Sequence, residues 1–338
     1  MSRYSRQELF AGIGREGQER IRAARVLVVG CGALGSALAE MMVRAGVGAL
    51  DVVDRDFVEE SNLQRQSLFE ESDVAARLPK AVAAERRLRR LNREVAVRGT
   101  VADLAADNAP ELIRGASLVL DGTDNFETRF LVNDVAVRDG VPWVYGACVA
   151  AYGLALLVRP KRTPCLRCLL ESLPPAGSGP TCDTAGVIAP IVHVIAGVQA
   201  GEALKLLAGR EESLLGGLVT VDLWEGRFDV MDLRGRAPSC RGCTEGRFDY
   251  AEARPESGAA VLCGRDAVQI RPPRGAPLEL GALAARLAPA GEVFRNDYLL
   301  RFQAPDAELI VFEDGRVLVK GVSSVAQARG VYARYVGS

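Results

Sequence analysis

The apolar positions of the first half of the chain come in short continuous runs separated by segments with helical spacing. The run VLVV at 26–29 leads into a glycine-rich turn and a helix over 34–45, and ALDVV at 49–53 follows. Continuous apolar runs of this length are typical of strands buried on both faces. The same alternation continues with strands at 95–101, 117–124 and 143–146 and helices at 79–91 and 126–138. The pattern predicts a doubly wound, largely parallel, Rossmann-like α/β sheet.

Further along, the pattern predicts strands that extend this sheet and one long apolar helix. GLALLVRP at 153–160 and two runs near 218–224 and 227–233 predict a mixed extension of the sheet. Residues 187–208 predict a strongly apolar helix, and we expect the single histidine, His193, to be buried within it.

Residues 259–338 predict a separate, small α+β module. The runs AVQI, DYLLRFQ, ELIVF and RVLVKG alternate as strands do, and SSVAQARGVYARYV predicts a closing helix with Ser323 as its N-cap. We therefore predict two domains, residues 1–249 and residues 259–338.

The composition indicates a globular protein. The 338 residues are 25% charged and 49% hydrophobic, and the formal net charge is −1, which gives no global attraction to nucleic acid. Polar sequence rather than a secretory signal follows Met1. Two uncharged stretches, Val141–Val158 and Thr184–Gly201, contain proline and glycine, and we interpret them as core elements rather than membrane spans. We expect a cytoplasmic protein with no nucleic-acid and no membrane partner.

The segment GCGALG at 30–35 matches G-x-G-x-x-G between a strand and a helix. Its glycines let a phosphate approach the backbone, and the helix N-terminus supplies partial positive charge. Asp54 ends the second strand, where a carboxylate can bind ribose hydroxyls. A tight turn without a ligand is the alternative, but the complete order of strand, loop, helix and acid favours a nucleotide site.

Four polar residues distinguish a triphosphate from a dinucleotide. Asn62 and Arg65 come just after the second strand, Lys80 starts a helix, and Asp124 ends the fourth strand. Each alone could be a surface charge. Together at the carboxyl edge of the sheet they favour phosphate chemistry, and a carboxylate beside phosphates favours Mg²⁺.

The order of these motifs along the chain makes the interpretation more specific. RYSRQ at 3–7, GCGALG, DVVDRD, SNLQRQ, PKA, DGTDNFETR, CLRC, TCDTAG and CRGC occur in the order seen in the ThiF/MoeB/HesA family, the bacterial relatives of ubiquitin-activating enzymes. The chain resembles this family over residues 3–249.

The resemblance implies an adenylyltransferase. In this family ATP-Mg²⁺ and the Gly-Gly tail of a ubiquitin-like sulfur-carrier protein (ThiS/MoaD-like) react to an acyl-adenylate and pyrophosphate, ahead of sulfur transfer from a separate donor. The implied catalytic residues are Arg6, acting on the neighbouring subunit of a homodimer, and Arg65, Lys80, Asp124 and Cys182. The implied nucleotide contacts are Gly30, Gly32, Ala33, Gly35, Asp54, Asp56, Ser61, Asn62, Arg65, Lys80, Asp124 and Asn125.

Two Cys-x-x-Cys pairs, Cys165/Cys168 and Cys240/Cys243, predict a Zn²⁺ site. Four thiolates suit tetrahedral zinc and leave no open position, which favours a structural role. The alternative is a redox-active pair, but we expect neither pair to open a helix after a strand, as thioredoxin-like pairs do. Cys182, by resemblance, can link to the carrier tail or its sulfur, and a spare loop cysteine is the alternative.

Other functions and roles stay open at this point. An NAD-dependent oxidoreductase would use the same glycine loop, and a non-catalytic carrier-binding scaffold would keep the same fold. The C-terminal module does not resemble the rhodanese domain that some relatives carry, since its only cysteine, Cys263, lies near its start. It could recruit the carrier or another partner, or it could stabilise a dimer or the fold. The sequence does not identify the carrier or its pathway.

Overall fold

The computed structural model describes residues 3–175, 179, 181–234, 239–253, 259–262, 267–271 and 278–337. The chain forms two compact units, Met1–Ala253 and Arg254–Ser338, which we treat separately. Cys263 and part of the PPAGSGP segment lie outside the described residues.

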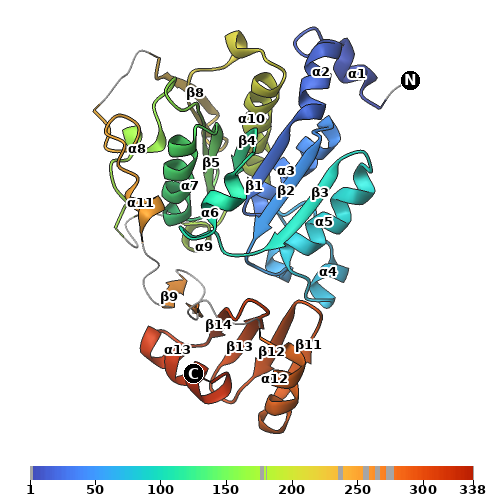
Figure 1. The fold of residues 1–338 in the computed structure, drawn as a ribbon, viewed down its shortest axis with the longest axis vertical. Coiled ribbons are helices and arrows are strands. Elements are labelled where there is room, and N and C mark those ends of the chain that lie inside the picture. The colour runs from blue at the N-terminus through green and yellow to red at the C-terminus, as the bar shows by residue number, and fades with distance from the viewer. Residues whose placement is uncertain are drawn as a thin grey trace. The chain divides into compact units, whose positions relative to one another are not determined.

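The first unit is built on an eight-stranded sheet with the order β3-β2-β1-β4-β5-β6-β7-β8 (Figure 1). The first five strands are parallel, and the last three add to the sheet in antiparallel pairs. The strands are β1 (Arg25–Val29), β2 (Ala49–Asp54), β3 (Ala96–Val101), β4 (Leu118–Asp121), β5 (Trp143–Val149), β6 (Tyr152–Val158), β7 (Gly217–Asp222) and β8 (Arg227–Asp232). The predicted fold class, including the mixed extension, is confirmed.

Helices cover this sheet in two groups. In the first group α3 packs against both α5 and α10, and in the second α6 packs against α7. The helices are α1 (Ser5–Leu9), α2 (Gly14–Ala23), α3 (Ala33–Ala45), α4 (Glu71–Ala75), α5 (Lys80–Leu91), α6 (Ala109–Ile113), α7 (Phe126–Asp139), α8 (Leu166–Leu169), α9 (Cys182–Ala185), α10 (Ala189–Leu207) and α11 (Asp249–Glu252), with short 3₁₀ turns at Glu60–Asn62 and Glu211–Ser213.

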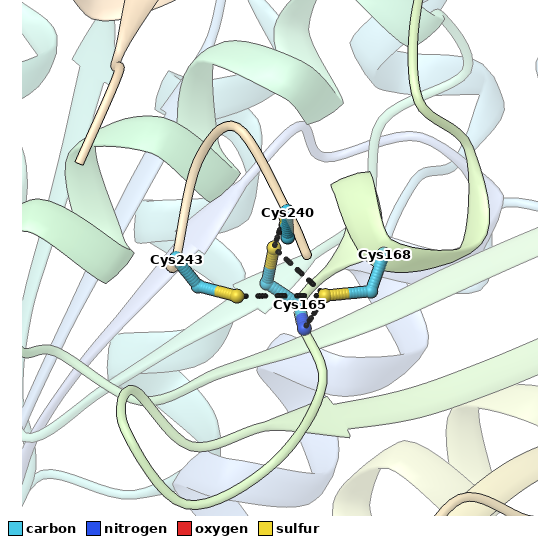
Figure 2. Close-up of side chains that lie close together, drawn as sticks. All are labelled: Cys165, Cys168, Cys240 and Cys243. Atoms are coloured by element: carbon cyan, nitrogen blue, oxygen red, sulfur yellow. Dashed lines mark hydrogen bonds between the residues drawn. The ribbon is translucent and has the colours of Figure 1, made fainter. Parts of the chain in front are cut away.

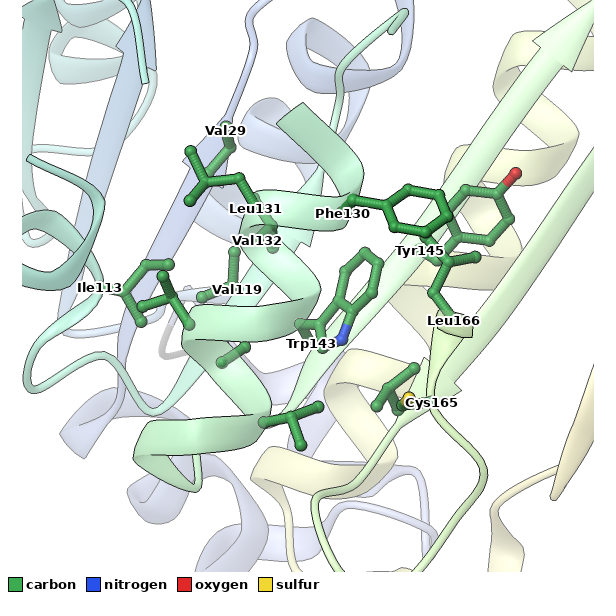
Figure 3. Close-up of a cluster of buried hydrophobic side chains, with 14 of the residues drawn as sticks. Val29, Ile113, Val119, Phe130, Leu131, Val132, Trp143, Tyr145, Cys165 and Leu166 are labelled. Carbon is green, nitrogen blue, oxygen red and sulfur yellow. The ribbon is translucent and has the colours of Figure 1, made fainter. Parts of the chain in front are cut away.

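Under α7 lies an apolar core that reaches from the sheet to the first cysteine pair. Phe130 of α7 packs beside Trp143 and Tyr145 of β5, and Cys165 and Leu166 belong to the same buried cluster (Figure 3). The cysteine segment is therefore anchored in the core of the domain.

By length and composition alone, α10 is long and apolar enough to cross a membrane. In the fold, 44% of its most apolar 18-residue stretch is buried. It packs against α3, β5 and β6, as a core helix does. Its buried face includes Ile191, Ile195 and Gln199. His193 lies two residues from Ile191, on the opposite side of the helix, and is exposed, so the predicted burial of His193 is wrong.

The second unit is a six-stranded antiparallel sheet with the order β11-β12-β13-β14-β10-β9. Helix α13 begins after Ser324, whose hydroxyl accepts a hydrogen bond from the backbone N–H of Gln327, so the N-cap is Ser324 and not the predicted Ser323. The elements are β9 (Ala259–Leu262), β10 (Ala267–Ile270), α12 (Leu280–Leu287), a 3₁₀ turn (Ala288–Ala290), β11 (Glu292–Arg295), β12 (Leu299–Gln303), β13 (Glu308–Phe312), β14 (Val317–Lys320) and α13 (Val325–Tyr335).

Candidate functional site

The glycine loop joins β1 to α3 in a turn that only glycine allows. Gly30 has φ +82°, and its N–H donates to the carbonyl of Val53 at 2.8 Å. A Cβ on Gly35 would collide with the carbonyl oxygen of Gly30. Gly122, in the loop after β4, packs against both Gly30 and Gly35. The loops that follow β1 and β4 therefore meet at the carboxyl edge of the sheet, where open α/β sheets bind ligands.

Asp54, the last residue of β2, is tied to the glycine loop. Its Oδ2 accepts from the N–H of Cys31 at 2.6 Å and its Oδ1 from the N–H of Asp56 at 2.7 Å. Burial raises the pKa of the Asp54 carboxyl, and the nearby Lys80 ammonium opposes this shift. Asp54 therefore holds the loop in place as well as offering oxygens at the predicted ribose position.

Lys80 brings a buried positive charge to the same edge. It is the first residue of α5, it is only 4% exposed, and its Nζ lies 3.7 Å from Oδ2 of Asp56. Its backbone N–H donates to the carbonyl of Asp56 at 2.9 Å. A buried ammonium is costly unless it is paired. The structure thus brings together Asp54, Asp56 and Lys80, three of the predicted nucleotide contacts.

The SNLQRQ segment forms a turn between β2 and α5. Asn62 is buried, and its Oδ1 accepts from the N–H of Glu59 at 3.1 Å. Nη1 of Arg65 donates to the carbonyl of Ser61 at 2.8 Å, so the half-buried guanidinium folds back onto its own turn.

Asp124 and Asn125 lie in the loop after β4. This strand ends at Asp121 and not at the predicted residue 124, so Asp124 lies in the loop, and its side chain is exposed. Asn125 is the N-cap of α7: its Oδ1 accepts from the N–H of Thr128 at 2.8 Å. Asp124 therefore offers an oxygen at the edge where the glycine loop opens, and a rigid helix start follows it.

Sequence reasoning missed the residues that hold this loop. Asp121 and Arg129 form a buried ion pair at 3.3 Å, and Arg129 also donates to the carbonyls of Thr123 at 2.7 Å and Gly146 at 3.1 Å. Nε2 of Gln199 donates to the carbonyls of Asp121 and Val144. The motif DGTDNFETR contains both partners of the ion pair, but their spacing does not show that they meet.

Gln66, the last residue of SNLQRQ, was also missed. It is buried, its Nε2 would lie 4.0 Å from a Cβ at Gly32, and its Oε1 has no hydrogen-bond partner among the described residues. It therefore lies against the glycine loop, at the residue that caps α3.

Arg6 lies near the amino ends of the strands, opposite the edge where the glycine loop opens. In α1, Nε2 of Gln7 donates to the carbonyl of Ala45, in the last turn of α3. The 13 residues of α3 put this point about 20 Å from the glycine loop. Figure 1 shows α1 beside the N-terminus, and Arg6 on it is exposed. Arg6 is thus not brought together with the other predicted residues of its own subunit.

Cys182 begins α9 beside the end of β5. Its Sγ donates to the carbonyl of Cys148 at 3.2 Å, and the N–H of Ala150 donates to the carbonyl of Gly186 at 2.8 Å. These bonds place Cys182 at the carboxyl edge of the sheet. Burial, and then the charge of Cys182, raises the pKa of the Cys148 thiol to about 12, so Cys148 is neutral at neutral pH.

The four predicted metal ligands converge (Figure 2). The sulfur atoms of Cys165, Cys168, Cys240 and Cys243 all lie within 4.8 Å of one another, with Sγ–Sγ distances of 3.7 Å (Cys165–Cys240) and 3.4 Å (Cys168–Cys243). Tetrahedral zinc with Zn–S bonds of about 2.3 Å needs sulfur atoms about 3.8 Å apart. The donor set and its spacing therefore fit zinc.

The first pair departs from expectation in one respect. Cys165 is the N-cap of the one-turn helix α8, so this pair does begin a helix, although residues 159–164 separate it from the end of β6 at Val158. The hydrogen bond from Cys168 is the main cause that lowers the pKa of Cys165 to about 5. A redox-active pair needs only two cysteines, whereas here a second pair converges on the first. This convergence favours a metal centre, wherever the first pair lies in the chain.

Known proteins match this chain in sequence over most of its length. A model of the ThiF family matches residues 4–242. This chain belongs to the ThiF family. The resemblance to that family is confirmed over most of the chain.

Several members of the ThiF family are close in sequence. A Bacillus subtilis (strain 168) protein named "Sulfur carrier protein ThiS adenylyltransferase" is 49% identical over 337 residues, 99% of each chain. A Thermus thermophilus protein named "Sulfur carrier protein adenylyltransferase" is 42% identical and covers 72% of this chain and 90% of its own. These relatives confirm the prediction of an adenylyltransferase.

Among solved structures, Escherichia coli MccB with ATP matches 72% of this chain and 74% of its own, with a TM-score of 0.62 and 23% identity. At this level of identity the match shows the shared fold.

Proposed function

We propose that the enzyme uses ATP to adenylate the C-terminal glycine of a ubiquitin-like sulfur-carrier protein. The observation that carries the proposal is the buried Lys80 ammonium, 3.7 Å from Asp56 at the edge where the glycine loop opens. A hydride-transfer site has no need of such a charge, whereas a departing pyrophosphate does. The name of the Bacillus relative, matched over the whole chain, supports a ThiS-like carrier as the substrate.

In the proposed reaction the carboxylate of the carrier tail attacks the α-phosphorus of ATP. A bond forms between the carboxylate oxygen and the α-phosphorus, the bond to the β-phosphate oxygen breaks, and pyrophosphate leaves. The glycine loop and Asp54 hold the nucleotide, and Asn62, Arg65 and Lys80 contact the phosphates. Asp124 would hold Mg²⁺, which neutralises phosphate charge when bound, and Asn125 lies beside it. A sulfur nucleophile from a separate donor would then attack the acyl carbon of the adenylate and displace AMP, with Cys182 as the candidate thiol.

The four-cysteine cluster supports a structural zinc role. Two chain segments far apart in the sequence supply two ligands each, and four protein ligands leave no position for a substrate. We assign adenylation and the zinc centre to residues 1–249. The ThiF family model supports the adenylation part of this assignment, because it matches residues 4–242. A cytoplasmic location is part of the same proposal.

Direct detection of the product tests this function. The full chain, ATP, Mg²⁺ and Bacillus subtilis ThiS should give a carrier heavier by one AMP in an intact mass spectrum, together with pyrophosphate. ThiS without its terminal glycines is the control and should stay unmodified. Oxidation of an alcohol with NAD would favour the oxidoreductase, and carrier binding without any AMP adduct would favour the scaffold.

The exposed surface of the first unit supports a homodimer. Leu9 and Phe10 follow Arg6 and are exposed, and so are Trp224 and Phe228 on the β7–β8 hairpin. Phe228 and the exposed Val230 are two residues apart on β8 and so share one face of the strand. Apolar side chains that are exposed together, rather than singly, mark interaction sites. Because Arg6 lies about 20 Å from the glycine loop of its own subunit, the proposed homodimer places it at the partner's phosphates.

Mixing two inactive variants tests this arrangement. Arg6→Ala and Asp124→Ala subunits, mixed one to one under conditions that allow exchange, should recover about a quarter of wild-type adenylation, because half of the dimers then contain one intact site. Each variant alone is the control. Full loss of activity in the mixture, with heterodimers shown by native mass spectrometry, would contradict a shared site.

A further inference from the structure

Asn133, in the middle of α7, is fully buried and contacts the first cysteine segment through both ends of its amide. Its Oδ1 accepts from the backbone N–H of Leu166 at 2.9 Å, and its Nδ2 lies 3.8 Å from Sγ of Cys165. Asn133 lies outside the two cysteine segments, and among the described residues its side chain is the one from outside them that donates to a cluster sulfur. One amide thus fixes both the backbone and a sulfur of the first pair.

Asp134, the next residue of α7, holds both cysteine segments. It forms a fully buried ion pair with Arg167, between Cys165 and Cys168, at 3.2 Å, and its Oδ2 accepts from the N–H of Tyr250 at 3.0 Å. Arg167 in turn donates to the carbonyl of Arg247 at 2.7 Å. The polar side chains of α7 therefore tie together the chain on both sides of the cluster.

Arg167 also packs against the second cysteine segment. Its Cδ lies 3.3 Å from the position that a Cβ on Gly242 would take. A side chain at residue 242 would press on the arginine, so glycine lets the two segments approach each other. The cysteines converge because protein contacts hold their segments, with α7 at the centre of those contacts.

Charge makes the sulfur contact important for metal binding. Four thiolates around one divalent cation leave two net negative charges in a largely buried place. An N–H donor to a ligand sulfur lowers this charge and fixes the orientation of the ligand, as outer hydrogen-bond partners of metal ligands generally do. Asn133 provides such a donor without adding a charge.

We propose that Asn133 is a positioning residue that sets the zinc affinity of the four-cysteine cluster by bonding both Sγ of Cys165 and the backbone of Leu166. This inference rests on the proposed zinc centre. Loss of the N–H donor weakens zinc binding even where the fold is kept.

Asn133→Asp is the informative variant, because it keeps an acceptor for Leu166 and replaces the N–H donor with a carboxylate oxygen. It also adds a buried negative charge beside Asp134, so its control must add a buried charge as well. The control is Asn92→Asp, since Asn92 is a buried asparagine whose Nδ2 donates to the hydroxyl of Tyr4 and the carbonyl of Val43 instead. Zinc dissociation constants of the full chains are measured by competition with a chromophoric chelator. Asn133→Asp should bind zinc about 10- to 100-fold more weakly than wild type, whereas Asn92→Asp should match wild type.

Each outcome has one meaning. Equal zinc affinity in Asn133→Asp and wild type would overturn the role of Asn133, as would an equal loss in both variants. A wild-type chain that binds no zinc would overturn the zinc centre itself. If Asn133→Asp does not fold, Asn133→Ser, which keeps a smaller donor and acceptor, should show an intermediate affinity, and an unchanged affinity there would equally contradict the proposal.

Discussion

Replacing Asp124 by alanine should lower ATP–pyrophosphate exchange by about 10³-fold, equivalent to about 4 kcal/mol of transition-state stabilisation. Asp124 offers an exposed carboxylate in the loop after β4, and Gly122 of that loop packs against the glycine loop. In the proposed site this carboxylate holds the Mg²⁺ that neutralises the phosphates. Without it, negative charge on the departing pyrophosphate is no longer compensated.

The effect of Asp124→Ala on exchange can be distinguished from an effect on folding. Because Asp124 is exposed, its loss should change the free energy of unfolding by less than about 0.5 kcal/mol. Glu127→Ala is the control, since Glu127 is an exposed carboxylate in the first turn of α7, and it should retain wild-type exchange. Exchange by Asp124→Ala within about tenfold of wild type would contradict the assigned role.

Replacing Arg129 by methionine should lower the free energy of unfolding by about 3–5 kcal/mol, because it leaves Asp121 as an unpaired buried charge. Arg129 also donates to the carbonyls of Thr123 and Gly146, so the loop that carries Asp124 should lose its support. Urea unfolding measures the first effect. The surface pair Arg44–Glu40 provides the control, since Arg44→Met should cost less than about 1 kcal/mol.

The pH dependence identifies the cause. Burial raises the pKa of Asp121, and Arg129 opposes this shift. Without Arg129 the folded-state pKa rises further, so the folded state binds a proton that the unfolded state has already released. Relative to wild type, the stability of the variant should therefore fall as pH rises above about 4, the usual pKa of an aspartate. A deficit that does not change with pH would show that lost packing, not the unpaired carboxylate, is responsible.

The features of the fold and of the site that depend on local sequence could be predicted. Buried parallel strands are continuous apolar runs, the glycine loop has fixed spacing, and paired cysteines indicate a metal. These signals gave the sheet, the nucleotide edge and the cysteine cluster.

Other features depend on contacts that spacing does not show. The ion pair of Asp121 and Arg129 forms only when α7 folds back over the turn after β4. The exposure of His193 was missed because α10 is apolar on both sides, so periodicity does not reveal its buried face. Ser323 and Ser324 are equivalent as caps in sequence, and the backbone alone distinguishes them. The contact of Asn133 with the cysteine cluster is likewise tertiary.

Isotope exchange between pyrophosphate and ATP tests the central claim most directly. With labelled pyrophosphate, Mg²⁺ and the wild-type chain, label should enter ATP when intact ThiS is present and not when ThiS lacks its Gly-Gly tail. Exchange that needs the tail is the signature of reversible acyl-adenylate formation. No exchange with any Gly-Gly-ended carrier, in a chain that is folded and loaded with zinc, would contradict the account.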